Sequence, residues 1–394
     1  MGVVGRLRLS VAFACSSVKG IAPMATPEFV SASRLMLVAP HPDDEALACS
    51  IILQRAVRAG AAVRVIYATD GDDNPWPQRV LERKWRLNAA DRKRWGNVRR
   101  SEALAALRML GVHARDAQFL ALPDQGITNL LKNGCRSTLA RLSRIIHAWS
   151  PTHLLVPSIA DTHPDHNALA VMLRLVVEDN FESRLSTWTY AVHGKSIAFF
   201  SRAQQFRQSE TEEATKLRAI LCHKTQIKLS RRRFLAYATR AERLLKLGSR
   251  EATAADGSIR SITRKTDILR LSLRLSPKLV RTGETALFLL GRDATGAMQC
   301  LKSRLPVHSC KIEMSDCSDG QSYGGAHYRG NTFTGEFVIP IDIFSPVHAL
   351  FVKLERRSLF FDEAGWLEIP GPVRSRQIDV GKGVRVGHAM LAIR

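Results

Sequence analysis

The sequence lacks several features that mark common classes of protein. No apolar run within its 394 residues approaches the roughly 18 residues of a membrane span, so we expect a protein that is soluble or at most peripheral to a membrane. No G-x-G-x-x-G segment is present, so a dinucleotide cofactor is not indicated. The seven cysteines are scattered, odd in number and without a C-x-x-C pair, which is typical of reduced thiols in a cytoplasmic protein. A bridge between Cys310 and Cys317 is the alternative.

Acidic residues are few relative to basic ones. The chain has 58 lysines and arginines against 36 aspartates and glutamates, a formal net charge of +22. Such a charge favours anionic partners, such as phosphorylated glycans, anionic lipid surfaces or nucleic acid. Nucleic-acid binding would rest on charge alone, because no recognised motif accompanies it, and nucleic acid is therefore not expected as a partner.

The chain is longer than one typical domain, and its texture changes along the sequence. We expect residues 1–32 to be a disordered leader; a start at Met24 and a secretion signal are the alternatives. Residues 33–250 form the first predicted domain, and residues 251–264 begin with a stretch rich in Ala, Asp, Gly and Ser that is typical of a linker. Residues 265–394 contain short alternating runs separated by Gly, Pro and Asp, which predicts an accessory β domain resembling a small sandwich.

The first predicted domain has an alternating pattern. From Arg34 to about Glu182, buried apolar strands alternate with helical patterns, one of them from Val98 to Leu110. Such alternation implies right-handed crossovers and a mostly parallel sheet, so we expect an α/β fold of the Rossmann-like three-layer type. Beyond it we expect a strand at Thr187–Val192 and a basic helical stretch from Glu210 to Gly248.

Two polar clusters follow buried strands. His41-Pro42-Asp43-Asp44-Glu45 comes directly after the apolar run 35–40, and its three carboxylates would repel one another unless a cation neutralised them. His163-Pro164-Asp165-His166 follows a second apolar run at 153–157. If the two strands are neighbours in a parallel sheet, the clusters converge at the carboxyl edge where ligands bind. They would then supply mixed nitrogen and oxygen ligands suited to zinc.

On these clusters the sequence resembles the de-N-acetylase family that includes the glycosylphosphatidylinositol-pathway and mycothiol-pathway deacetylases and the LmbE-like proteins. The family's hallmarks, a strand followed by HPDDE and a later HPDH, stand here at His41–Glu45 and His163–His166. Thr69-Asp70-Gly71, Leu120–Asp124 and Lys216–Gln226 resemble further family segments. The resemblance covers roughly residues 33 to 250 in the right order.

The resemblance implies a zinc-dependent hydrolase that removes the N-acetyl group from an N-acetylglucosamine-type amino sugar. The substrate would be a glycoconjugate or glycolipid, such as an anionic envelope glycan like lipopolysaccharide. Three residues would bind the metal, for which iron or cobalt are alternatives to zinc: His41, Asp44 and His166. Asp43 would be the general base, His163 would stabilise the oxyanion, and Asp165 would orient His163. Proton delivery to the leaving amine falls to Asp43 or His163.

Several segments outside the clusters have a functional and a structural interpretation. The segment Asp72–Asn97 holds Trp76, Trp85 and Trp95 among basic residues and is either a substrate lid or an amphipathic surface helix. Four further residues have a structural interpretation beside a functional one. Glu45 is a first-turn carboxylate favoured by the helix dipole, Asp70 stabilises its turn, and Arg99 forms a surface pair with Glu102 at helical spacing. His193 lies near a strand end, and a position in the pocket is its functional alternative.

Charge and family together define where such a protein would act. The run Arg231–Arg233 is a solvated helix face or a binding site for phosphate or anionic lipid headgroups. We expect a cytoplasmic protein that contacts the inner membrane peripherally. The main alternative to the hydrolase is a catalytically silent glycan-binding protein of the same fold, in which the β domain recognises the glycan.

Overall fold

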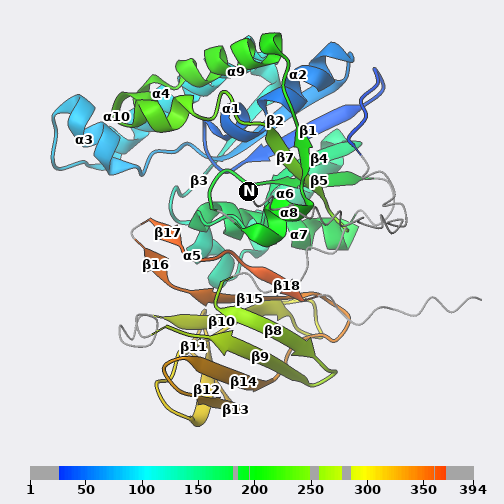
Figure 1. Cartoon of the computed structure of the whole chain (residues 1–394), viewed down its shortest axis with the longest axis vertical. Coiled ribbons are helices and arrows are strands. Elements are labelled where there is room, and N and C mark those ends of the chain that lie inside the picture. Colours follow the sequence, from blue (N-terminus) through cyan, green and yellow to red (C-terminus); the bar gives the residue numbers. More distant parts are fainter. Residues whose placement is uncertain are drawn as a thin grey trace, which may run out of the picture.

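A computed structural model describes residues 26–180, 185–194, 196–248, 257–276, 285–358 and 360–369 of the chain. An α/β domain and a C-terminal β domain lie one above the other (Figure 1). Most of the predicted leader, residues 1–25, and residues 249–256 of the predicted linker fall outside the described ranges. Among the described residues, no helix combines the length and apolarity needed to cross a membrane.

The α/β domain is built on a seven-stranded sheet. Its strands are β1 (Arg34–Ala39), β2 (Ala62–Thr69), β3 (Ala117–Leu122), β4 (His153–Pro157), β5 (Ser186–Tyr190), β6 (Gln204–Phe206) and β7 (Glu242–Lys246). Their order across the sheet is β3-β2-β1-β4-β5-β7-β6, and only β7 runs against its neighbours. The mostly parallel sheet is confirmed. Since the chain winds away from β1 in both directions, the carboxyl ends of β1 and β4 form the crevice where such sheets bind ligands.

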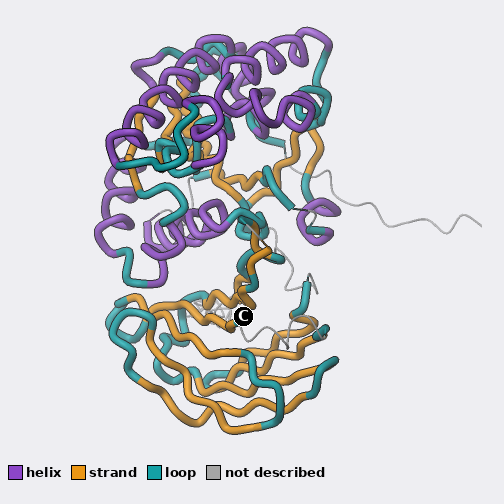
Figure 2. The backbone as a smooth tube through the Cα atoms, turned by 90° about the vertical axis from the view of Figure 1, so that its left-hand side faces the viewer, coloured by secondary structure: helices purple, strands orange, loops and turns teal. Residues whose placement is uncertain are grey.

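Helices cover both faces of this sheet (Figure 2). They are α1 (Asp44–Ala48), α2 (Ser50–Arg58), α3 (Pro75–Glu82), α4 (Ala89–Met109), α5 (Ile127–Lys132), α6 (Arg136–Trp149), α7 (Pro164–Asn180), α8 (Ile197–Arg202), α9 (Glu210–Cys222), α10 (Lys224–Leu235) and the 3-10 turn η1 (Ala114–Asp116). Leu35 and Leu37 of β1 pack with α1, α2, α4 and α9, whereas Met36 and Val38 pack with α5, α6 and α7. Burial on both faces explains why the strand is apolar without alternation.

Two segments differ from the sequence prediction. Helix α4 begins at Ala89, well before Val98, because a capping box forms there. The side chain of Asn88 accepts a hydrogen bond from the Asp91 amide, and the Asp91 carboxylate accepts one from the Asn88 amide. The stretch predicted to be helical up to Gly248 ends as strand β7, which fills the space between β5 and β6. Pairing on both sides overrides the local helical pattern.

The C-terminal β domain is one antiparallel sheet of nine strands. They are β8 (Ile259–Arg264), β9 (Ile268–Arg274), β10 (Ala286–Arg292), β11 (Met298–Arg304), β12 (Cys310–Asp316), β13 (Ser322–Gly330), β14 (Thr334–Pro340), β15 (Leu350–Glu355) and β18 (Leu367–Ile369). The strands follow the order β18-β15-β10-β11-β12-β13-β14-β9-β8. The sheet that they form is curved (Figure 2), and its apolar side chains make a single core. Strand β8 occupies residues that the sequence assigned to the linker. A short hairpin, β16 (Arg357–Ser358) with β17 (Phe361–Asp362), leaves this sheet.

The two domains share an apolar interface. Along β10, Leu287 and Leu289 belong to the core of the β domain, whereas Phe288 and Leu290 pack with α5, α6 and α7 of the α/β domain. At the edge of this interface Lys132 of α5 makes an ion pair of 2.8 Å with Glu355. Because one strand is buried on both faces, the β domain is held against the α/β domain.

A buried ion pair connects α9, β7 and the beginning of α2. Lys216 of α9 and Glu242 of β7 lie 3.0 Å apart, and both side chains are fully buried. The carboxylate of Glu242 also accepts hydrogen bonds from the hydroxyl of Ser50 and the amides of Ile51 and Ile52, at the beginning of α2. Glu242 therefore satisfies helix-terminal donors that would otherwise be buried without a partner.

We expect the substitution Glu242→Gln to lower the free energy of unfolding by about 3 kcal/mol, because it leaves the Lys216 ammonium buried without a counter-charge. Chemical denaturation would measure the change. The matched control is Glu336→Gln on β14, whose exposed carboxylate lies 3.7 Å from Arg270 and whose loss should cost less than about 0.5 kcal/mol. Equal effects of the two substitutions would contradict the role of Glu242.

Candidate active site

The two predicted clusters meet at the crevice. Strands β1 and β4 are parallel neighbours, with Leu37 opposite Leu155. The loop after β1 carries His41 and leads into Asp44 at the start of α1, and the first turn of α7 carries His166. Nδ1 of His41 lies 3.1 Å from Nε2 of His166, and Oδ2 of Asp44 lies 3.5 Å from Nε2 of His166 and 3.8 Å from Nδ1 of His41. The structure thus brings together the three side chains predicted to bind the metal.

These three side chains fit a divalent metal. Two imidazole nitrogens and one carboxylate oxygen face the same point, which is the donor set of catalytic zinc sites that keep an open position. All three residues are buried. Burial raises the pKa of Asp44 to about 6, although the neighbouring His166 and His41 act to lower it. A cation at this point would stabilise the charged carboxylate.

Buried carboxylates hold the far side of each imidazole. Nε2 of His41 lies 3.1 Å from Asp124 and 3.5 Å from Asp165, and Nδ1 of His166 lies 3.2 Å from Asp161. Burial alone would raise the pKa of Asp161, but the charge and hydrogen bond of His166 hold it at about 2. Carboxylates in this position fix the orientation of metal-binding imidazoles.

Neither Asp124 nor Asp161 was singled out from the sequence as a site residue. A signal was nevertheless present, because each lies just beyond the carboxyl end of a parallel strand, β3 for Asp124 and β4 for Asp161.

Asp43 faces the pocket in a strained conformation. Its φ of 128° is unusual for a residue other than glycine. Its Oδ2 accepts a hydrogen bond of 2.9 Å from Arg99 of α4, whose guanidinium also donates to the carbonyls of Gly71 and Pro42. A side chain at Gly71 would collide with this guanidinium, since an added Cβ would lie 1.8 Å from Arg99 Nη1. Burial raises the pKa of Asp43, and Arg99 counteracts this effect.

The expected surface pair of Arg99 with Glu102 is therefore wrong. Arg99 is buried in the site, and Glu102 instead accepts hydrogen bonds from the amide and hydroxyl of Thr225. Helix α4 directs one residue toward the catalytic loops and the other toward the start of α10.

Glu45 also does more than complement a helix dipole. One of its oxygens accepts a hydrogen bond of 2.9 Å from the backbone amide of Asp43, and the other lies 2.7 Å from Nε2 of His223. Both Glu45 and His223 are buried. Glu45, held by His223, thus fixes the backbone amide of Asp43. His223 belongs to the segment Lys216–Gln226, which resembles a segment of the family.

His163 and Asp165 interact differently from the prediction. Nδ1 of His163 accepts a hydrogen bond of 3.2 Å from the backbone amide of Asp165. The ring is therefore oriented by the backbone of Asp165 and not by its carboxylate. The Asp165 carboxylate instead accepts hydrogen bonds from the amides of Gln125 and Ile127, at the start of α5, and lies near His41. Asp165 therefore orients His163 through its backbone, and its carboxylate connects the loop after β3 with the metal-binding region.

A pocket of about 210 Å³ opens above these residues. Its floor contains His41, Asp43, Asp44, Asp124 and His163. Its walls come from three places, namely the start of α3, helix α10 with the segment after it, and the hairpin of the C-terminal domain: Asn74, Pro77, Gln226, Ser230, Arg233, Phe234, Tyr237, Phe360 and Phe361. His193 lines the pocket as anticipated, and its Nδ1 lies 3.3 Å from Arg233.

The three tryptophans of the segment Asp72–Asn97 have different roles. Trp95 on α4 is 3% exposed and packs in the interior, as the structural interpretation held. Trp76 and Trp85 are 49% and 74% exposed and lie on the projecting α3 region. Since Asn74 and Pro77 line the pocket, this region forms part of its rim.

Comparison with known proteins finds matches to the part of the chain that holds these residues. Residues 36–177 match the family model "PIG-L: GlcNAc-PI de-N-acetylase". The 1D-myo-inositol 2-acetamido-2-deoxy-alpha-D-glucopyranoside deacetylases of Mycobacterium avium and Mycobacterium tuberculosis are each 31% identical over 147 residues, which cover 34% of this chain and 47% of those proteins. The chain thus spans about half the length of the curated relatives it matches.

Among solved structures, N,N'-diacetylchitobiose deacetylase from Pyrococcus horikoshii is 18% identical, with a TM-score of 0.42 over 55% of this chain and 84% of that chain. The family match to residues 36–177 includes both polar clusters and the three residues that face the metal position. Residues 36–177, which hold the site, therefore match the PIG-L (LmbE-like) deacetylase domain.

Proposed function

We propose that this protein is a metal-dependent hydrolase that removes the N-acetyl group from an N-acetylglucosamine-type amino sugar. The observation that carries the proposal is the convergence of His41, Asp44 and His166 beside Asp43 and His163 at one pocket. The family match includes all five residues, and the curated relatives are named as deacetylases of an acetamido sugar.

We assign His41, Asp44 and His166 to the metal and propose zinc as the ion, because two imidazoles and a carboxylate suit it; iron or cobalt would accept the same ligands. When bound, the ion supplies a Lewis acid that polarises the acetamide carbonyl and lowers the pKa of water.

Asp43 is the proposed general base. Its carboxylate lines the pocket beside the three metal-binding side chains. The hydrogen bond from Arg99 fixes one carboxylate oxygen and leaves the other to accept a proton from the attacking water. The water oxygen then forms a bond to the acetamide carbon, whose carbonyl oxygen becomes an oxyanion.

His163 is the proposed oxyanion donor. Its Nδ1 accepts a hydrogen bond from the Asp165 amide, so the neutral ring carries its proton on Nε2. Burial and the neighbouring His41 and His166 hold the pKa of His163 well below its ordinary value, which favours this neutral donor. A neutral imidazole is a poor acid for the leaving group. We therefore propose that Asp43 returns its proton to the sugar nitrogen as the C–N bond breaks and acetate leaves.

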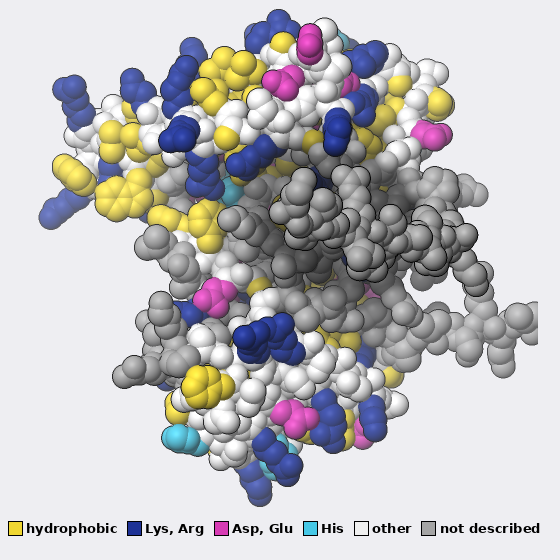
Figure 3. Space-filling model, viewed as in Figure 1, with side chains coloured by type: hydrophobic (Ala, Val, Ile, Leu, Met, Phe, Trp, Pro, Cys, Tyr) yellow, Lys and Arg dark blue, Asp and Glu magenta, His cyan; other side chains and the backbone are white. Residues whose placement is uncertain are grey.

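The proposed substrate is an anionic glycoconjugate or glycolipid, such as an envelope glycan. The charge of +22 supports an anionic partner, and Arg233 reaches the pocket from α10. Around α3, exposed apolar side chains gather among basic ones (Figure 3), and the guanidinium of Arg79 lies over the ring of Trp76 at 5.2 Å. Exposed tryptophans flanked by lysines and arginines are suited to the headgroup region of an anionic membrane.

We further propose that the protein acts in the cytoplasm and contacts the inner membrane through the α3 region. The described cysteines are unpaired, which suits a reducing compartment: Cys49, Cys135, Cys222, Cys300, Cys310 and Cys317. Contact through α3 would bring a membrane-bound glycolipid to the rim of the pocket.

Zinc binding tests the metal assignment. Isothermal titration calorimetry of the metal-free protein with zinc should give one binding site. His166→Ala should weaken zinc binding by more than about 100-fold, and Asp161→Asn, which removes only the carboxylate behind His166, by about 10-fold. His327→Ala, on an exposed position of β13, serves as the control and should bind as the unaltered protein does. Unchanged binding in His166→Ala would disprove the assignment.

Acetate release tests the reaction. Zinc-loaded protein should release acetate from N-acetylglucosamine glycosides or glycolipids, and Asp43→Asn should lower kcat by at least about 100-fold while zinc stays bound. Asp342→Asn, at an exposed position of the β domain, is the matched control. Release of phosphate or another acyl group alone would contradict the deacetylase. Tight glycan binding without any turnover would instead support the catalytically silent glycan-binding protein.

Vesicle binding tests the membrane contact. The double substitution Trp76→Ala with Trp85→Ala should weaken sedimentation with vesicles that contain phosphatidylglycerol by about 10-fold, because both rings lose their place at the interface. Neutral phosphatidylcholine vesicles should bind weakly whichever variant is used. The control is Phe333→Ala, which alters an exposed residue of the β domain. If the double variant and this control sediment with the vesicles to the same extent, α3 is not the contact.

A further inference from the structure

We infer that Phe360 and Phe361, at the end of the β16–β17 hairpin of the C-terminal domain, form an aromatic subsite for the sugar ring next to the acetylated one. This inference rests on the proposed deacetylase function. These two residues line the same pocket as Asp43 and His163, although about 200 residues separate them from the HPDH cluster.

The ring of Phe361 lies beside the imidazoles of His193 and His163. The centroid of its ring lies 5.2 Å from that of His193 and 5.8 Å from that of His163, and the guanidinium of Arg233 lies over it at 5.7 Å. The β domain thus closes one side of the pocket with an aromatic ring.

The turn is fixed to the loop that carries the catalytic residues. The amide of Asp362 donates to the carbonyl of Thr162 at 2.8 Å, and the amide of Trp366 donates to the carbonyl of Ile159 at 2.8 Å. Gly365 approaches the same loop so closely that an added Cβ would lie 1.9 Å from the Ile159 carbonyl oxygen. Two backbone hydrogen bonds and the close approach of Gly365 hold the segment that follows Phe361 against this loop.

A buried polar network strengthens this attachment. Oδ2 of Asp362 accepts a hydrogen bond of 2.9 Å from the side-chain amide of Asn167 and another from the ammonium of Lys353. The same ammonium donates to Oδ1 of Asn167 at 3.2 Å. All three residues are buried, and Asn167 directly follows the metal-facing His166 on α7. The position of the turn is therefore tied to the position of the metal-binding helix.

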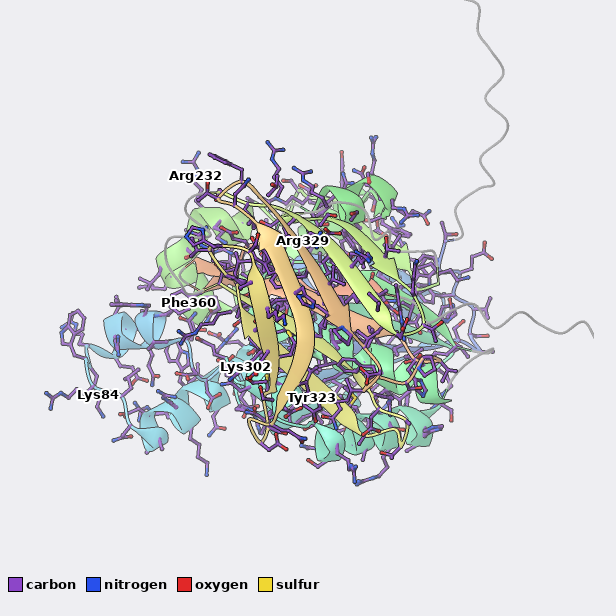
Figure 4. All side chains as sticks on the ribbon, turned by 90° about the horizontal axis from the view of Figure 1, so that it is seen from below. Lys84, Arg232, Lys302, Tyr323, Arg329 and Phe360 are labelled. Carbon is purple, nitrogen blue, oxygen red and sulfur yellow. The ribbon has the colours of Figure 1, made fainter. Side chains whose placement is uncertain are left out.

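Phe360 is the part of the turn that is open to a ligand. Its side chain is 45% exposed at the rim, and Figure 4 shows it on the side of the molecule that also carries Arg232 and Lys84. The pocket volume of about 210 Å³ is small beside the roughly 300–1,000 Å³ of typical ligand sites. Only part of a glycoconjugate fits inside, so its next ring must cross the rim. An exposed aromatic face there is suited to stack on the apolar face of that ring.

The test compares two substrates with the zinc-loaded full chain, N-acetylglucosamine and its N-acetylated disaccharide. Phe360→Ala should lower the ratio of kcat/KM for the disaccharide to that for the monosaccharide by about five- to tenfold, mainly through KM, because stacking contributes binding rather than chemistry. Phe360→Tyr, which keeps the aromatic face, should retain the ratio. The matched control is Phe333→Ala, which removes a ring that is 62% exposed on the same domain and outside the pocket lining.

An unchanged ratio in Phe360→Ala, with acetate still released, would overturn the subsite and leave the deacetylase standing. The proposed function fails only if the unaltered protein also releases no acetate from the glycosides and glycolipids of the acetate-release test. If it releases none from these two sugars, the subsite is decided by binding. Saturation-transfer NMR of the disaccharide should show weaker binding to Phe360→Ala than to Phe333→Ala. Equal binding to the two variants would overturn the subsite.

Discussion

The carboxylates buried at the carboxyl ends of the central strands are the constraint on which the rest of the site depends. Six acidic residues lie at or near one pocket, each less than one-tenth exposed: Asp43, Asp44, Glu45, Asp124, Asp161 and Asp165. Such a group is stable only if each member has a positive or hydrogen-bonding partner. Arg99 serves Asp43, His223 serves Glu45, and backbone amides serve Asp165. The carboxylate of Asp44 faces the proposed metal position together with the imidazoles of His41 and His166.

Sequence patterns predicted the centre of this arrangement because the chemistry is local there. HPDDE and HPDH each follow a strand that is buried on both faces, and that placement determines which edge of the sheet they occupy. The supporting residues could not be found in the same way. Single aspartates such as Asp124 and Asp161 are common in loops, and only the strand order β3-β2-β1-β4 shows that they flank the imidazoles. Arg99 looked like a surface residue because its partners lie 28 and 56 positions earlier.

Long-range packing explains the other differences. Strand β7 inserts between β5 and β6, so its structure depends on neighbours that a local pattern does not reveal. The same holds for β10, whose run Ala286–Leu290 looks like an ordinary buried strand. In the structure its two faces serve two different cores, one of which extends into the α/β domain. The aromatic wall at Phe361 follows from that interface and could not be inferred from either domain alone.

The network of Lys353, Asp362 and Asn167 has a consequence for how the pocket forms. Its members come from β15, β17 and α7, so it is complete only when the C-terminal sheet has folded onto the α/β domain. During synthesis the metal-facing residues emerge long before this point. The wall of the pocket is therefore complete only after the two domains have docked, and the shape of the binding site reports that docking.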